Sequence, residues 1–223
     1  MSIILFAGTV FMGFFAIMNP IANTPVFISL TNNVESSAGR RKIAFNAIFY
    51  AFIIVSVFCI AGHIIFKLFG ITLPAFQITG GILLFVVGMH MLNGKHSTVV
   101  HPSTDSHKNA IKQQVAEGNS NVAITPLAMP ILAGPGTIAT AMNFIGSSTK
   151  LGNIEQVVVV IVIFAIMCFI SFLLFIGGAK LIKLLGHGLV NVISRIMGLI
   201  LAVIAVQMVI SGVNGVLKMY YNI

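Results

Sequence analysis

The chain has 223 residues, of which 58% are hydrophobic and 7% charged, with a formal net charge of +8 and a mean hydropathy of +1.07. A soluble domain carries about 25% charged residues, so this chain cannot cover a water-facing surface and must present apolar side chains to lipid. The basic residues flank apolar runs instead of forming a stripe, which argues against nucleic-acid binding. Cys59 and Cys168 lie inside apolar runs, where isolated cysteines are more often buried hydrophobes than a disulfide or metal pair.

The apolar runs predict six transmembrane helices, because a helix needs about 20 mostly apolar residues to cross a bilayer. The expected spans are 3–30, 43–69, 73–93, 121–147, 154–180 and 191–215. The first run is too long for a cleaved signal peptide and lacks a basic start, so we expect it to be a helix of the mature protein. The expected fold class is an all-α polytopic membrane protein.

A polar stretch at residues 94–120 divides the chain. It separates a first three-helix repeat, residues 1–93, from a second, residues 121–223, and we expect it to be a cytoplasmic loop. Its three histidines could form a metal site, but a solvated loop is the favoured interpretation because no fixed helical face presents them together. These histidines are His96, His101 and His107.

The basic residues predict the topology. One group follows the first, third and fifth spans or lies near a span end: Arg40, Arg41, Lys42, Lys95, Lys108, Lys112, Lys180, Lys183 and Arg195. The opposite side holds only Lys67, Lys150 and Lys218. By the positive-inside rule the first group is cytoplasmic, which places both termini on the outer side of the inner membrane. Three helices per half also mean that the second half enters the membrane from the opposite side.

The two halves resemble each other at three places, in the same order. The pairs are NPIANTP (19–25) with MPILAGP (129–135), AGHIIFKLFG (61–70) with GGAKLIKLLG (177–186), and QITGGILL (77–84) with RIMGLILA (195–202). Transporters are often built from such repeats in inverted orientation. We therefore predict two inverted three-helix repeats whose first helices, the first and fourth of the chain, are broken.

Each break contains two prolines five residues apart, Pro20 with Pro25 and Pro130 with Pro135. Proline removes a backbone hydrogen bond, and in hydrocarbon the freed groups must be satisfied by protein or by a water-filled cavity. A pair of half-helix ends can hold a small zwitterion or an ion without a charged side chain. The alternative is that the breaks are structural kinks. The expected substrate-binding residues of the breaks are Asn19, Pro20, Asn23, Thr24, Pro25, Pro130, Gly134, Pro135, Gly136 and Thr137.

Two further polar residues, Gln77 and Arg195, occupy equivalent places in the repeat and are also candidates for substrate binding. Arg195 either attracts a substrate carboxylate or extends to the cytoplasmic surface. For the other polar residues of the spans, structural hydrogen bonding or packing is the favoured role, although the two histidines are alternative proton carriers. These residues are Asn46, His63, His90, Asn143 and Gln207.

No carboxylate lies in the middle of an expected span, since the four acidic residues are Glu35, Asp105, Glu117 and Glu155. This disfavours a carboxylate proton relay and a cation channel with an acidic ring. The chain also lacks a paired-histidine zinc motif and a glycine-rich phosphate loop followed by lysine, and Ser171 has no convincing base partner. We therefore expect neither an enzyme nor a bound cofactor or metal.

Three segments carry a resemblance to a known family. MNPIANTPVF (18–27), PLAMPILAGPGTI (126–138) and SRIMGLIL (194–201) resemble the MarC family of bacterial inner-membrane proteins, and the resemblance runs through nearly the whole chain. Members are described as carriers of small neutral amino acids such as glycine and alanine, which implies the same function here. Two positions depart from the expected pattern, Ala22 in place of glycine and Gln207 in place of an acid, and the second bears on ion coupling.

The leading hypothesis is a secondary transporter of small neutral amino acids. Its expected partners are a small solute, a coupling proton or sodium ion, and the lipid bilayer, with no nucleic acid. Glycines at Gly80, Gly81 and Gly198 would permit close helix contact, either within the chain or in a homo-oligomer. The alternatives are an exporter of other small solutes or drugs, and a membrane protein with a structural or assembly role.

Overall fold

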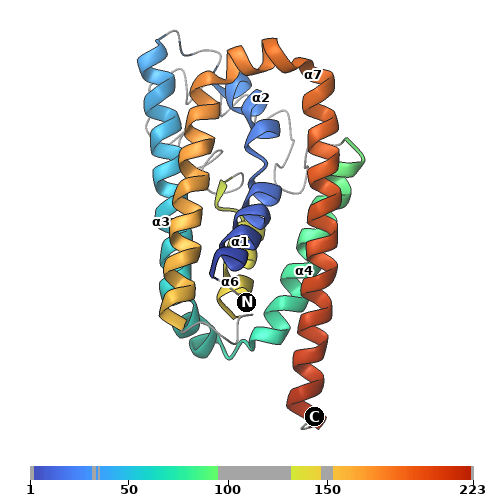
Figure 1. The fold of residues 1–223 in the computed structure, drawn as a ribbon. Coiled ribbons are helices and arrows are strands. Elements are labelled where there is room, and N and C mark those ends of the chain that lie inside the picture. Colours follow the sequence, from blue (N-terminus) through green and yellow to red (C-terminus); the bar gives the residue numbers. More distant parts are fainter. Residues whose placement is uncertain (1–2, 32–33, 35, 95–131, 147–152, 222–223) are drawn as a thin grey trace.

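The computed structural model describes residues 3–31, 34, 36–94, 132–146 and 153–221, and these residues form helices without any strand (Figure 1). The helices are α1 (Ile3–Met18), α2 (Pro20–Leu30), α3 (Ser37–Phe69), α4 (Leu73–Leu92), α6 (Pro135–Gly146) and α7 (Asn153–Tyr221). Five stretches of the described residues are long and apolar enough to cross a membrane. The predicted class, an all-α polytopic membrane protein, is confirmed.

The predicted fourth span, 121–147, is described only from residue 132 onward, where α6 has 12 residues. The six-span arrangement therefore stays a prediction, as do the boundaries of the two repeats around residues 94–120. The start of the second span also differs. Helix α3 begins at Ser37 rather than residue 43, because basic side chains are good helix formers and the helix continues beyond its apolar run.

Helix α7 contains the predicted fifth and sixth spans as two antiparallel segments (Figure 1). The chain reverses at Gly186, whose φ of 70° and ψ of 159° are not helical. Glycine adopts such a positive φ without steric cost, since it has no Cβ atom. The bend lies at the end of the bundle where α3 begins, and Ile3 and the C-terminal end of α7 lie at the opposite end (Figure 1).

Helix α3 shows which side chains face lipid. A stripe of large apolar side chains is exposed along it at spacings of three and four residues: Phe45, Phe49, Ile53, Val57, Ile60 and Ile64. Such a continuous apolar surface is unfavourable in water and favourable in hydrocarbon. The opposite face carries small residues, including Ala44, Ala47 and Ala51, which are fully buried. The small side chains allow α3 to approach the rest of the bundle closely.

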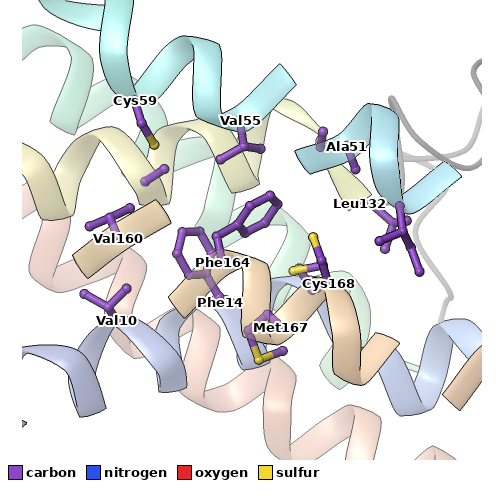
Figure 2. Close-up of a cluster of buried hydrophobic side chains, with 14 of the residues drawn as sticks. Val10, Phe14, Ala51, Val55, Cys59, Leu132, Val160, Phe164, Met167 and Cys168 are labelled. Carbon is purple, nitrogen blue, oxygen red and sulfur yellow. The ribbon is translucent and has the colours of Figure 1, made fainter. Parts of the chain in front are cut away.

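The main apolar core lies where α1, α3 and the first segment of α7 meet (Figure 2). Phe14 of α1 and Phe164 of α7 pack at its centre with ring centroids 4.9 Å apart. Leu132, which precedes α6, is also completely buried in this core. The core therefore joins helices of both predicted halves.

Helices that the predicted repeat makes equivalent pack in antiparallel pairs. In the pair formed by α4 and the second segment of α7, a Cβ atom added at any of three glycines would lie 2.8 Å from a backbone carbonyl oxygen of the other helix. The glycines and their facing carbonyls are Gly88 with Gly198, Gly81 with Ala205, and Gly212 with Pro74. Small residues recur every seven positions on both helices, so the two backbones run in contact over their length. Gly81 and Gly198, which were predicted to permit close helix contact, thus allow α4 and α7 of the same chain to approach each other.

The other two pairs run antiparallel as well. Phe52 and Phe45 of α3 contact Phe164 and Phe172 of α7, respectively, with ring centroids 6.3 and 6.2 Å apart. In α1 and α6, Gly13 faces Thr140, and Gly136 faces Ile17. Antiparallel packing of all three pairs is the arrangement that inverted repeats require.

Replacing Gly88 with leucine is expected to destabilise the fold, because any side chain at this position meets the α7 backbone. Overpacking of this kind typically costs about 1–3 kcal/mol. Because Cys59 and Cys168 are buried, a thiol-reactive dye reports unfolding directly in detergent. Gly8→Leu is the matched control, since a Cβ atom there meets nothing within 4 Å. An equal melting temperature for both variants would show that α4 and α7 are not tightly packed.

Candidate functional site

The first predicted break is a single residue, Asn19, between α1 and α2. Its φ of 35° and ψ of 64° lie in the left-handed region, and among the described residues it is the only non-glycine residue with positive φ. Asparagine is one of the few residues that adopts this conformation readily. Pro20 then begins α2 at a position where its missing N–H is not needed. Helix α2 continues through Pro25, so the interruption is shorter than the predicted 19–25.

The side chains beside the break satisfy the backbone groups that it frees. The Asn19 carboxamide oxygen accepts a 3.3 Å bond from the Ala22 N–H, and Asn23 Nδ2 donates a 2.6 Å bond to the Met18 carbonyl. The Thr24 hydroxyl donates a 2.7 Å bond to the Pro20 carbonyl. The first two bonds occupy groups that the break frees, whereas the Thr24 bond is made within α2 to a carbonyl four residues earlier. The predicted substrate role of Asn23 and Thr24 therefore competes with a structural one.

The carbonyl of Ala16 is a further consequence of the break. In a continuous helix it would accept from the N–H four residues later, but Pro20 has none. Ala16 is completely buried, in an apolar cluster that includes Leu84 and Ala139. The last turn of α1 thus ends in a buried region with the negative end of its helix dipole.

The second predicted break leads into α6. The Gly134 carbonyl accepts a 3.1 Å bond from the Ile138 N–H, so Gly134 stands at the N-cap position with Pro135 first in the helix. Glycine has no side chain to cap the first-turn amides of Gly136 and Thr137. Gly134, Gly136 and Thr137 are buried. The N-terminus of α6 is therefore a buried helix end without a side-chain cap from its N-cap residue. Pro130 lies outside the described residues.

The two breaks lie beside each other. A Cβ atom on Gly136, at the start of α6, would lie 3.0 Å from Ile17 Cδ1, at the end of α1, and 3.0 Å from Leu84 Cδ2 of α4. The positive end of α6 thus faces the negative end of α1 across apolar side chains. In this conformation Ile17 and Leu84 occupy the space against Gly136, so a solute can enter only if they move.

Each broken helix is hydrogen-bonded to the third helix of the other half. Asn19 Nδ2 donates to Ser194 Oγ over 3.4 Å, and Gln77 Nε2 donates to Asn143 Oδ1 over 2.9 Å. Asn19, Ser194 and Gln77 are buried. Gln77 is four residues from the start of α4 and thus lies toward the opposite end of the bundle from Asn19. It is therefore not brought into one site with the Asn19 break.

Arg195 is also separate from the breaks. It is exposed, and its guanidinium lies beside Gly94, where a Cβ atom would be 3.1 Å from Nη2. This is the C-terminal end of α4, where a positive charge is favourable. The geometry matches the predicted extension toward the membrane surface. Of the remaining polar residues, Gln207 is exposed and Asn46 half-buried, whereas the side chain of His63 and the loop histidines lie outside the described residues.

Two residues near the breaks were not among the predicted site residues. Ser194 adjoins Arg195 in the sequence, but neighbours on a helix point in different directions, and Ser194 faces Asn19. Thr140 follows Gly136 by four residues, on the same face of α6, and its hydroxyl is buried with no hydrogen-bond partner. Their four-residue spacing places Thr140 on the same helix face as Gly136, so the sequence alone could have identified Thr140 as a neighbour of the break. Among the described residues there is no cluster of three metal-ligating side chains.

Comparisons with known proteins agree with this fold. Residues 4–217 match the description "MarC family integral membrane protein". The chain belongs to the MarC family. It is 39% identical over 206 residues to the UPF0056 membrane protein YvbG of Bacillus subtilis, covering 92% of this chain and 93% of that one.

Two further relatives match over a similarly large share of their length. The UPF0056 membrane protein of Aquifex aeolicus is 37% identical over 208 residues, covering 93% of this chain and 92% of that one. YhcE of Escherichia coli, also a UPF0056 membrane protein, is 31% identical over 206 residues, covering 92% of this chain and 91% of that one. No solved structure matches the chain.

Substitutions at Asn19 should separate its backbone role from its side-chain role. Asn19→Gly keeps the left-handed conformation and loses only the capping oxygen and the bond to Ser194. Asn19→Ala also introduces a left-handed strain of about 1–2 kcal/mol. We expect Asn19→Ala to lower the melting temperature more than Asn19→Gly, measured with the thiol-reactive dye. If alanine were the better tolerated residue, the left-handed break would be wrong.

Proposed function

We propose that this protein is a secondary transporter of small neutral amino acids, of the size of glycine or alanine, across the inner membrane. The observation that carries the proposal is the pairing of two opposite helix ends. The N-terminus of α6, whose N-cap residue Gly134 has no side chain to cap it, lies beside the last turn of α1 at Gly136 and Ile17. Such a pair complements a zwitterion while adding no net charge to the membrane interior.

The chemistry assigns each end of the solute. The carboxylate would accept from the amides of Gly136 and Thr137, where the α6 dipole is positive. The ammonium would donate to the end of α1, where the Ala16 carbonyl lacks its helical N–H partner. The Thr140 hydroxyl, one turn further along α6, supplies a donor and acceptor that the protein itself leaves unused.

The size of the solute follows from the packing. Ile17 and Leu84 already lie within van der Waals distance of a Cβ position at Gly136. Only a small solute would fit after a limited movement of these side chains, whereas a large side chain would have to displace helices. This favours glycine or alanine over bulky drugs. Direction of transport and a coupling proton or sodium ion are parts of the proposal that transport assays must establish.

A second candidate is a structural or assembly role, in which the breaks only pack. The hydrogen bonds of Asn19 and Asn23 favour it, because they pair the Ala22 N–H and the Met18 carbonyl at the first break without a solute. The two candidates differ in what they require of Thr140. A packing role does not need an unpaired buried hydroxyl. Solute binding would give this hydroxyl a partner. Neither candidate involves enzymatic chemistry.

Thr140→Val is therefore the most informative substitution. It replaces the hydroxyl with a methyl group of similar shape. Since the hydroxyl is buried and unpaired, its removal should leave the melting temperature unchanged or raise it. If the hydroxyl binds the solute, uptake of labelled alanine into proteoliposomes should fall about tenfold, which corresponds to one lost hydrogen bond of about 1.4 kcal/mol.

The control is Thr79→Val, because Thr79 is an exposed residue of α4 whose hydroxyl bonds to its own helix. Uptake by this variant should match that of the wild type. Wild-type protein that carries no small amino acid, with or without a proton or sodium gradient, would contradict the proposal. Full uptake by the stable Thr140→Val variant would show that Thr140 is not part of the binding site.

A further inference from the structure

A cavity lies at the end of the bundle where α2 ends and α3 begins, beside the first segment of α7 (Figure 1). Its volume is about 150 Å³. One side is polar and formed by Ser37, Arg40 and Arg41 of α3, and the other is apolar and includes Phe27 of α2 and Phe175 of α7. The cavity is far along α2 from the Asn19 break, so it is separate from the proposed transport site.

The polar side carries two arginines, Arg40 and Arg41. Arg40 is oriented by a 2.8 Å bond from its Nε to the Val34 carbonyl, which leaves its terminal nitrogens for another acceptor. Arg41 is exposed. Among the described residues the only acidic side chain is Glu155, which begins α7 at the opposite end of the bundle (Figure 1). No described carboxylate therefore neutralises the two guanidinium groups.

The first turn of α3 adds to this positive potential. Ser36 stands at the N-cap but its side chain makes no capping hydrogen bond, and the first turn contains no acidic residue. The N–H groups of a first turn and the helix dipole both favour an anion. The arginines and the helix start therefore act on the same cavity.

The apolar side continues into the lipid-facing surface. The Phe27 and Phe175 rings are stacked with centroids 4.7 Å apart, and Ile176 beside them is 49% exposed. Arg41 precedes Phe45 and Phe49 by four and eight residues, so it stands at the end of the lipid-facing stripe of α3. The cavity thus lies at the boundary between headgroups and acyl chains.

We propose that this cavity binds the phosphate headgroup of an anionic phospholipid. A cavity of about 150 Å³ has room for several water molecules, and thus for a phosphate group but not for a whole lipid. The phosphate bonds to Arg40, Arg41 and Ser37, and the acyl chains lie outside, against Ile176. Basic pockets between transmembrane helices recognise anionic lipids in this way. The site does not depend on the proposed transport function.

The chain has no tryptophan, so a single tryptophan introduced by Ile176→Trp reports on its own surroundings. The protein is reconstituted in phosphatidylcholine vesicles that contain increasing fractions of brominated phosphatidylglycerol, which quenches nearby tryptophan. We expect half-maximal quenching at a lower fraction than for Ile60→Trp, a lipid-exposed residue further along α3. Brominated phosphatidylcholine should quench both reporters equally.

Adding Arg41→Gln to the Ile176→Trp protein should raise the half-quenching fraction about fivefold, the effect of one basic residue near a membrane surface. Lys67→Gln is the matched control, because Lys67 is an exposed basic residue at the other end of the same helix. It should leave the quenching curve unchanged. Thiol-dye melting of each variant checks the fold independently of lipid binding.

Three results would overturn the proposal. One is identical quenching at 176 by the two brominated lipids. A second is an equal effect of Arg41→Gln and Lys67→Gln, which would indicate general surface charge. The third is loss of the phosphatidylglycerol preference on adding inorganic phosphate at constant ionic strength, which would indicate a soluble anion site.

Discussion

The structure depends on one constraint, the satisfaction of every backbone hydrogen-bonding group within hydrocarbon. A membrane helix can be interrupted only where something replaces its lost hydrogen bonds. At Asn19 the replacements come from nearby carboxamides, since Asn19 caps Ala22 and Asn23 supplies the Met18 carbonyl. A single left-handed residue is therefore enough to end one helix and start another. The start of α6 is different, because Gly134 has no side chain with which to cap the amides that follow. The two breaks therefore differ: at the start of α6 the first-turn amides have no cap from Gly134, and the nearby Thr140 hydroxyl has no hydrogen-bond partner.

The helices around the breaks differ in how tightly they are held. Helix α4 and the second segment of α7 touch through backbone at Gly81, Gly88 and Gly212, so neither helix can slide without a clash. By contrast, α1 meets α6 through side chains, Ile17 at Gly136 and Phe144 at Gly13. Side chains change rotamer more easily than backbones separate. The α4–α7 pair is thus held through backbone contact, whereas the two breaks meet only through side chains.

The sequence predicts the fold well where the signal is local. Apolar run length locates the five spans that the structure describes, and Pro20 and Pro135 each mark the start of a helix, because both signals act through a helix's own backbone. The length of the first interruption could not be derived, since α2 continues through Pro25, which the proline spacing alone did not predict. Hydrogen-bond partners on helices far apart in the chain also could not be predicted from the sequence. Whether Ser194 or Arg195 faces Asn19 depends on the rotation of α7 about its axis, which the packing of Gly198 against α4 determines. The sequence therefore predicted the region of the breaks, but neither the position of Thr140 beside them nor the separation of Gln77 from Asn19.

Helix α2 connects the proposed transport site with the basic cavity. It begins at Asn19 and ends near Thr31, and its 11 residues span about 16 Å at a rise of about 1.5 Å each. Its middle is held against α7, because Gly178 leaves room only for the methyl group of Thr24 and for Ile28. Its last turn lines the basic cavity with Phe27 and ends before Arg40 and Arg41. A rigid helix this short moves as a unit, so a shift of its last turn also shifts Pro20 and the Asn19 break. A headgroup in the basic cavity would therefore restrain the same helix whose start forms one side of the proposed transport site.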